Sequence, residues 1–143
     1  LKRKLSSTFR EDPEIVLQYV QSLSDEKTAE AALRKSITRG AWRSDYFLAY
    51  ASLGRNTLSL RLKFANIWLK NHGSNSDLHL ALANMYLISG DVGEAKQACL
   101  RSIKLSPSKV ALEMMARLVS EEGNHAESNK YFKQVLSLSN SPR

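Results

Sequence analysis

The chain has 143 residues, 43% of them hydrophobic and 24% charged, which is the composition of an ordinary globular fold. No run of about 18 apolar residues occurs, so the sequence predicts no membrane-spanning segment within it, and no secretory signal is visible. The single cysteine, Cys99, excludes an internal disulfide framework, and we expect it to pack in the core as a small hydrophobe.

The net charge of +7 is unevenly distributed along the chain. Residues 1–72 hold 13 Lys and Arg against 7 Asp and Glu, whereas residues 73–143 hold 8 against 7. We interpret the basic surplus of the first half as charge on solvated helix faces. The alternative is attraction to an acidic partner or to an anionic membrane surface.

Residues 1–11 are predicted to be a linker or the end of a truncated helix, and because the chain begins with Leu1 we expect a longer parent protein. A first repeat follows over about residues 12–40. Asp12 can cap a helix there, and Pro13 suits its first turn. The apolar stripe of this first helix is Ile15, Val16, Tyr19, Val20 and Leu23. A second helix is predicted from about Thr28 to Arg39, with Ala29, Ala32, Leu33 and Ile37 facing inward.

The second repeat, over about residues 44–73, is less regular. Ser44 is predicted to cap a short helix, a turn follows at Gly54, and a long helix extends to about His72. We expect the aromatic residues of the short helix to pack in the core rather than to stack on nucleic-acid bases. The predicted core residues are Tyr46, Phe47, Tyr50 and Leu53 in the short helix and Leu58, Leu62, Ala65, Trp68 and Leu69 in the long one.

The third repeat, residues 76–107, has the clearest pattern. Two stretches with apolar residues at helical spacing meet at Gly90, which can adopt the left-handed conformation that closes a helix. Asp91 can cap the next helix. Ala83 and Ala95 are small where the two helices would cross. Together with Tyr86 and Pro107, these residues resemble the tetratricopeptide repeat.

The fourth repeat, residues 109–138, contains the same turn 33 residues later, at Gly123, and we expect Phe132, Val135 and Leu136 to pack its last helix. Residues 28–37 also align with residues 94–103 at a shift of 66, twice that distance. A period of about 33–34 residues is that of the tetratricopeptide repeat. The sequence therefore predicts an all-α, tetratricopeptide-like α-solenoid of about eight antiparallel helices over residues 12–138, with a tail at 139–143.

Motifs for catalysis and for metal binding are missing from the sequence. There is no glycine-rich phosphate loop, HExxH, CxxC or GxSxG. The histidines are far apart in the sequence: His72 ends a helix, His79 occupies a core position and His125 follows a cap. Glu121 and Glu122 are adjacent, so they face different directions on a helix. We predict no enzyme activity, no catalytic residue and no metal site.

A repeat of this kind would bind its partner on the concave face, which the first helix of each repeat lines. By register, that face shows Glu14, Asp77 and Val110 and the partner-binding candidates Gln18, Gln21, Leu80, Asn84, Leu87, Glu113 and Arg117. Some tetratricopeptide domains hold a peptide carboxylate with an Asn at the position of Asn84. Leu80 and Val110 stand where such a clamp would have Lys, so a mixed groove for a helix or an extended segment is expected instead.

The order of features over about residues 12–138 resembles the HemY-type proteins of proteobacterial haem-biosynthesis operons. The family's Trp-Leu-Lys-x-His tract stands here as residues 68–72, and the similarity is best over residues 61–91 and 106–138. Two departures are Gly73, where the family usually has Pro, and Val92, where it commonly has Trp.

The resemblance implies an inner-membrane protein whose anchoring helices are absent from this sequence, with the repeat domain on the cytoplasmic side. It further implies a scaffold that holds enzymes of late haem or porphyrin biosynthesis together. No cofactor is predicted; haem or porphyrin binding through His79 or Met85 is a subsidiary hypothesis. A homo-oligomer is left open.

Two rival functions remain at this point. One is a generic tetratricopeptide adaptor for envelope assembly, secretion or pilus biogenesis. The other is a nucleic-acid-binding solenoid, suggested by the isoelectric point of 9.7 but disfavoured because the repeats lack a recurring pair of base-reading residues.

Overall fold

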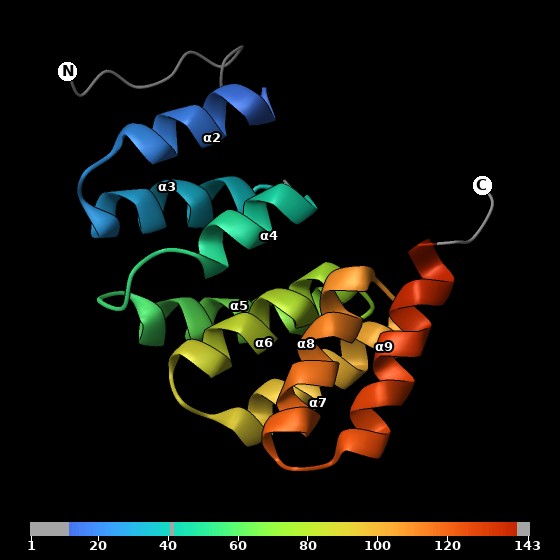
Figure 1. Cartoon of the computed structure of the whole chain (residues 1–143). Helices are drawn as coiled ribbons and strands as arrows, with labels where there is room; N and C mark the ends of the chain where they lie inside the picture. The colour runs from blue at the N-terminus through green and yellow to red at the C-terminus, as the bar shows by residue number, and fades with distance from the viewer. Residues whose placement is uncertain (1–11, 41, 140–143) are drawn as a thin grey trace. The chain divides into compact units, whose positions relative to one another are not determined.

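The computed structural model describes residues 12–40 and 42–139 (Figure 1). That part of the chain holds eight helices and no strand, as the sequence predicts. The predicted linker over residues 1–11 and the tail from residue 140 lie outside the described residues. The helices are α2 (Pro13–Ser22), α3 (Glu26–Thr38), α4 (Ser44–Ala51), α5 (Leu58–His72), α6 (Ser76–Ile88), α7 (Val92–Leu105), α8 (Lys109–Glu121) and α9 (His125–Ser139).

The chain divides into two compact units, residues 1–68 and residues 69–143, and the division falls inside α5. In chain order the helices form the pairs α2–α3, α4–α5, α6–α7 and α8–α9, one pair for each of the four predicted repeats. The bounds of the repeat domain, residues 12–138, stay a prediction. None of the described helices combines the length and the apolar character that crossing a bilayer requires.

The ends of the helices in the second unit are set by local sequence signals. Gly90 follows α6 with φ of +86°, and Gly123 follows α8 with φ of +88°, a backbone region that side chains disfavour. Asp91 then accepts a hydrogen bond from the backbone N–H of Glu94 at 3.2 Å, and Asn124 accepts one from that of Glu127 at 3.1 Å. The predicted turns and caps are confirmed here.

The core of the second unit is closely packed around small residues. Ala83 and Ala95 are fully buried where α6 meets α7, as predicted. Cys99 is also fully buried, and its thiol donates a hydrogen bond to the carbonyl oxygen of Ala111 in α8 at 3.2 Å. Burial raises the pKa of this thiol to about 11, so Cys99 is a neutral packing residue, as expected.

The first unit keeps most of the predicted apolar core. Tyr46, Phe47 and Tyr50 are at most 2% exposed, and the Trp68 ring lies 5.2 Å from that of Tyr50. One predicted cap is wrong. Ser44 is the first residue of α4 rather than its cap. Arg43 precedes the helix and makes no side-chain capping bond, because a guanidinium has no acceptor for a backbone N–H; it pairs with Asp45 at 3.1 Å.

Two charged residues inside the first unit were not predicted to be buried. Arg61 is 0% exposed and donates to the backbone carbonyl oxygens of Tyr50 at 2.9 Å and Leu53 at 3.0 Å, and also to that of Gly54. It therefore satisfies the carbonyl groups that α4 leaves open at its C-terminal end. Glu30 is 1% exposed and accepts bonds from Arg34 at 2.8 Å and from the Tyr50 hydroxyl at 2.7 Å.

A second prediction about the core is wrong in the last helix. Val135 is buried, but Phe132 is 43% exposed and Leu136 is 61% exposed. Both residues recur at helical spacing, which favours a core position. They are open to solvent because no described element covers that side of α9.

Candidate protein-binding face

The candidate binding residues of the third repeat lie on α6. Leu80, Asn84 and Leu87 follow one another at spacings of four and three residues, so they share one face of the helix. The start of α6 is fixed by Asn75, whose side chain accepts bonds from the backbone N–H of Asp77 at 3.0 Å and of Leu78 at 3.1 Å. Leu80 is 8% exposed, whereas Asn84 and Leu87 are half-buried, so the latter two provide most of the accessible surface.

The candidate residues of the fourth repeat lie on α8 at equivalent positions. A shift of 33 residues takes Leu80 to Glu113 and Asn84 to Arg117. Arg117 and Glu113 form an ion pair with an N–O distance of 3.6 Å, and the Arg117 side chain is 71% exposed. An exposed pair of this kind contributes only about 0.3–0.5 kcal/mol, so Arg117 can exchange Glu113 for a carboxylate of a ligand at little cost.

Apolar and polar groups alternate on this part of α8. Val110 is 58% exposed and precedes Glu113 by three residues, which places both on the same side of the helix. The repeat register predicts that α6 and α8 line one face, and on that face the two helices present an accessible aliphatic group, an amide, a carboxylate and a guanidinium. We call Asn84, Leu87, Val110, Glu113 and Arg117 the first-helix face.

The candidate residues of the first repeat form a separate set in the first unit. Gln18 and Gln21 are both exposed on α2 and lie three residues apart, on one side of the helix. Neither carries charge, and Glu14 near the start of the helix is the exposed carboxylate of that side. The structure therefore groups the predicted residues by unit: two glutamines in the first, and the remaining five in the second.

The histidine and methionine considered for haem are both interior residues. Met85 is 0% exposed. His79 is 6% exposed, and its Nε2 lies 2.7 Å from the carbonyl oxygen of Gly73, which requires a hydrogen on Nε2. The other ring nitrogen, Nδ1, is buried and has no hydrogen-bond partner among the described residues. Ligation of an iron by either residue would require the core to open, and haem binding stays untested.

No group of three or more His, Cys, Asp or Glu side chains that could hold a metal ion occurs in residues 12–40 and 42–139. Three buried titratable groups of the first unit, Glu30, Tyr50 and Arg61, have hydrogen-bond partners within that unit. The Tyr50 hydroxyl, for example, donates to Glu30, and burial together with that bond raises the pKa of Tyr50. Glu30, Tyr50 and Arg61 are therefore satisfied inside the first unit, where their bonds stabilise the fold.

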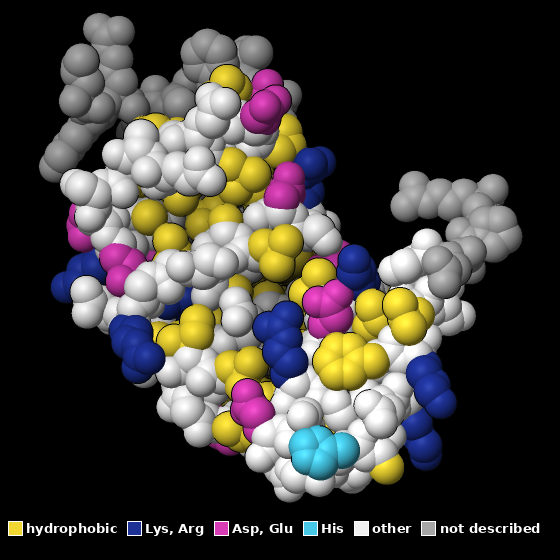
Figure 2. Space-filling model, in the orientation of Figure 1, with side chains coloured by type: hydrophobic (Ala, Val, Ile, Leu, Met, Phe, Trp, Pro, Cys, Tyr) yellow, Lys and Arg dark blue, Asp and Glu magenta, His cyan; other side chains and the backbone are white. Residues whose placement is uncertain are grey.

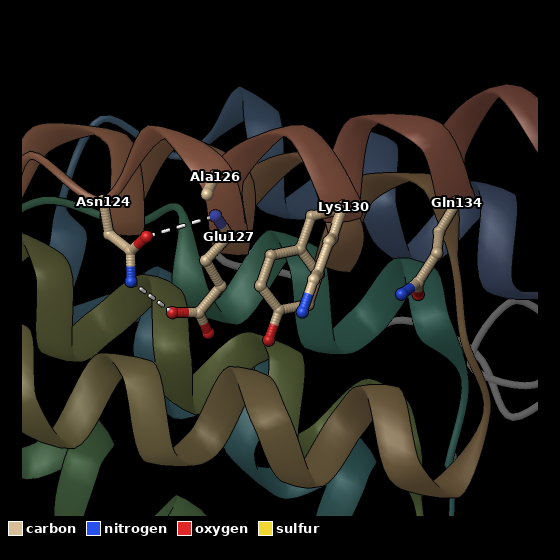
Figure 3. A pocket seen from close by; sticks show the side chains of 6 residues that line it. Asn124, Ala126, Glu127, Lys130 and Gln134 are labelled. Carbon is tan, nitrogen blue, oxygen red and sulfur yellow. Dashed lines mark hydrogen bonds between the residues drawn. The ribbon is translucent and has the colours of Figure 1, made fainter.

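A pocket of about 410 Å³ lies along the start of α9 (Figure 3). Asn124 and Glu127, at one end of it, bond to each other: the Asn124 amide donates to the Glu127 carboxylate at 2.8 Å and accepts from the Glu127 backbone N–H at 3.1 Å. These polar groups are therefore occupied in capping the helix. The residues that line the pocket are Asn124, Ala126, Glu127, Lys130, Tyr131 and Gln134.

The sequence does not predict this pocket from the concave-face register, because its residues belong to the second helix of a repeat and its cap, and that register selects residues of first helices. The signal that was available is the spacing of Glu127, Lys130, Tyr131 and Gln134, which lie three to four residues apart on α9.

Comparisons with known proteins agree with the geometry. The tetratricopeptide repeat family matches residues 76–109, which include α6 and α7. No curated protein sequence matches the chain. Among solved structures, a crystal structure of MamA aligns with a TM-score of 0.64 at 17% identity, covering 91% of this chain and 81% of that one. The structure of MamA from residue 41 to its end, from Desulfovibrio magneticus RS-1, aligns with a TM-score of 0.65 at 14% identity, covering 90% and 76%.

At these identities the likeness to MamA shows the fold alone. The predicted fold class, an all-α tetratricopeptide-like α-solenoid, is confirmed. The family match supports the tetratricopeptide part of the predicted resemblance, and the HemY-type part stays a prediction.

Proposed function

We propose that this chain is a non-enzymatic scaffold that binds other proteins through the first-helix face. The observation that carries the proposal is the accessible pair of Asn84 on α6 and Arg117 on α8, at equivalent positions of two successive repeats. The amide of Asn84 and the guanidinium of Arg117 can bind backbone and carboxylate groups of a segment that crosses both helices. Leu87 and Val110 add apolar contact area beside them.

A helix or an extended segment fits this face better than a charged tail alone. The face has one guanidinium and one carboxylate, so its net charge is small, and its exposed aliphatic groups favour a partner with apolar side chains of its own. Arg117 is the residue that such a partner would bind most strongly, because a guanidinium makes two parallel hydrogen bonds to a carboxylate.

For the biological setting we propose a membrane-tethered protein of late haem or porphyrin biosynthesis, whose repeat domain holds pathway enzymes together on the cytoplasmic side. This proposal is supported by the sequence resemblance alone, chiefly the tract at residues 68–72. In the structure Trp68 is 5% exposed and its indole N–H donates to Thr38 at 3.3 Å, so the Trp of this tract has a packing role in the first unit. A generic adaptor for envelope assembly, secretion or pilus biogenesis is the rival.

The experiment is a pull-down of the tagged full-length protein from its native membranes, with partners identified by mass spectrometry. We expect enrichment of haem-pathway enzymes, lost when Asn84 and Arg117 are both changed to Ala. Arg101→Ala is the matched control, since Arg101 is an exposed Arg on α7, outside the first-helix face.

The outcomes separate the two levels of the proposal. If secretion or envelope proteins are enriched instead, and are lost in the same double variant, the first-helix face is supported as the binding site. The haem-biosynthesis setting would then be wrong, and the generic adaptor would be favoured. Partners that remain bound in the double variant and are lost in Arg101→Ala would overturn the face itself.

A further inference from the structure

The second helices of the first two repeats, α3 and α5, lie side by side in the first unit and run in the same direction. At their starts, the Glu26 carboxylate accepts a hydrogen bond from the backbone N–H of Thr57 at 2.6 Å. Near their ends, Thr38 accepts one from the indole N–H of Trp68 at 3.3 Å. Because start meets start and end meets end, the two helices are parallel neighbours.

The outer side of α3 exposes lysine side chains. Leu33 is fully buried, whereas Ala31 is exposed and lies about 160° away from it around the helix axis. Lys27 and Lys35 lie four residues before and after Ala31, so they extend the same exposed side by one turn in each direction.

The outer side of α5 combines a lysine with aliphatic groups. Ala65 is buried, whereas Lys63 is exposed and lies about 160° away from it. Leu60 and Ile67, three residues before and four after Lys63, are 38% and 42% exposed. Since α3 and α5 are parallel neighbours that bury their opposite sides in one core, their exposed sides are continuous. The residues of this α3–α5 outer face are Lys27, Ala31, Lys35, Leu60, Lys63 and Ile67.

The α3–α5 outer face carries three positive charges and no carboxylate. Among the residues that the structure describes, Lys27, Lys35 and Lys63 form no ion pair. Asp25, which caps α3, is an exposed carboxylate at the edge of the face and offsets part of the charge of Lys27. Lys35 lies ten residues from Asp25, about 15 Å along the helix, so the centre of the face stays positive.

The charge of the first unit is divided between its two sides. α2 and α4 contain no Lys or Arg, and Glu14 and Asp45 lie in their first turns. Figure 2 shows Asp and Glu side chains over the starts of these two helices. The carboxylates of Glu26 and Glu30 are engaged in hydrogen bonds within the unit. The α3–α5 outer face is therefore the basic side of the first unit.

We propose that the α3–α5 outer face binds the surface of an anionic lipid bilayer. Phosphate head groups attract the three ammonium groups. Leu60 and Ile67 reach below the head groups, because the flexible stem of Lys63 between them lets its ammonium group stay at the level of the phosphates. The occupant thus supplies both parts that the face lacks, negative charge and an apolar layer.

A nucleic acid fits the same face less well. Proteins that hold single strands combine positive charge with aromatic side chains on which bases stack, and none of the six residues of the face is aromatic. The neighbouring ring of Phe64 is covered by the guanidinium of Arg34, 4.5 Å from its centre. The bilayer proposal is separate from the first-helix face, since it concerns second helices only, and either can fail without the other.

The test is flotation of the 143-residue chain with vesicles of phosphatidylcholine, alone or with about 30% phosphatidylglycerol. We expect binding to the vesicles that contain phosphatidylglycerol, falling as NaCl rises from about 0.05 M to about 0.5 M. Lys27→Gln, Lys35→Gln and Lys63→Gln combined should lower the partition coefficient at least about tenfold.

The matched control removes the same charge from the second unit. Lys104, Lys130 and Lys133 are exposed on α7 and α9, outside the α3–α5 outer face. The triple variant Lys104→Gln, Lys130→Gln and Lys133→Gln is expected to bind the vesicles like the unchanged chain. Circular dichroism shows whether all variants keep their helices, as expected for substitutions at exposed positions.

A fluorescent label reports whether the face itself meets the lipid. Ile67→Cys carries an environment-sensitive dye, and Cys99 does not compete for the reagent because it is fully buried. We expect the emission of the dye to shift to shorter wavelength on vesicles that contain phosphatidylglycerol. The same dye at Gln18→Cys, which is exposed on α2, should show no shift.

Four results would overturn the proposal. The first is the absence of binding that depends on phosphatidylglycerol. The second is an equal loss in the two triple variants, because binding would then follow net charge alone. The third is binding that the variant of the face leaves unchanged, which would assign it to other cations such as those at residues 2–4. The fourth is binding of a single-stranded oligonucleotide that the variant of the face abolishes, without a shift of the dye at position 67 on vesicles, because the occupant would then be a nucleic acid.

Discussion

The buried guanidinium of Arg61 donates a hydrogen bond from Nε to the hydroxyl oxygen of Thr57 at 3.0 Å, while its other nitrogens close the end of α4. The Thr57 hydroxyl in turn donates to the carboxylate of Glu26 at 2.6 Å, as does the Thr57 backbone N–H, also at 2.6 Å. A chain of hydrogen bonds therefore joins α3 to the turn before α5, and Arg61 joins that turn to the end of α4.

Replacing Arg61 by Met should destabilise the first unit by about 3 kcal/mol or more, because several buried carbonyl groups would lose their donor. Arg61→Lys should recover only part of the loss, since an ammonium group has three donors and cannot reach the same set of carbonyls.

Both tryptophans, Trp42 and Trp68, belong to the first unit, so urea unfolding followed by tryptophan fluorescence measures this unit selectively. Arg55→Met, at an exposed position, is the control; an equal loss in both variants would contradict the assignment.

Gly54→Ala should destabilise the same unit through Glu26. A Cβ at position 54 would collide with the Glu26 carboxylate, which would have to move away from Thr57. We expect a cost of about 1 kcal/mol for the weakened hydrogen bonds. In a Glu26→Ala background the added methyl group meets no carboxylate, so the cost should fall toward zero. A cost that is the same in both backgrounds would show that position 54 is strained for another reason.

Acid should weaken the first unit. The hydrogen bond from the Thr57 hydroxyl lowers the pKa of Glu26 below its ordinary value of 4.5, and hydrogen bonds from Thr28 and from Arg43 lower those of Asp25 and Asp45. A carboxyl whose pKa is depressed by folding stabilises the fold above its unfolded pKa, and this contribution is lost as the pH falls through its folded pKa. The tryptophan-detected free energy of unfolding should therefore drop from about pH 5 downward.

Glu26→Gln should make this drop shallower, because one of the three groups can no longer take up a proton. The measurement is a set of urea titrations between about pH 3 and 6 for both proteins. An unchanged slope would mean that Glu26 is not coupled to folding.

Cys99 should report on the second unit. Its thiol is fully buried and its pKa is raised to about 11, so the native protein should react only slowly with a disulfide reagent at pH 8. Labelling should follow the loss of helix that circular dichroism detects at urea concentrations where the tryptophan signal does not change. Complete labelling of the native protein within the dead time of mixing would contradict the packing of α7 against α8.

The helices and turns of the second unit could be predicted because their signals are local. Gly90, Asp91, Gly123 and Asn124 act on backbone groups within three or four residues, so the sequence window contains both the signal and its target. Cys99 could be assigned to the core because a free cysteine packs as a small hydrophobe, and the structure buries it fully.

The charged core of the first unit could not be predicted in this way. Arg61 and Glu30 are residue types that are almost never fully buried unless paired, and the partner of Glu30 in α4 lies twenty residues away. For Phe132 and Leu136 the error is the reverse, because they were predicted to be buried and are exposed. Their spacing is that of core residues, but spacing alone does not show whether another helix covers them.

Site-specific photocrosslinking in the native cells tests most directly whether the first-helix face binds a partner. A photoreactive amino acid would be placed at Leu87 or Arg117 on this face, or at Gln97 or Arg101, which are exposed on α7. We predict that the same protein partner is crosslinked from positions 87 and 117 and from neither position on α7. Crosslinks only from positions 97 and 101, with none from α6 or α8, would contradict the account and move the binding surface to the second helices.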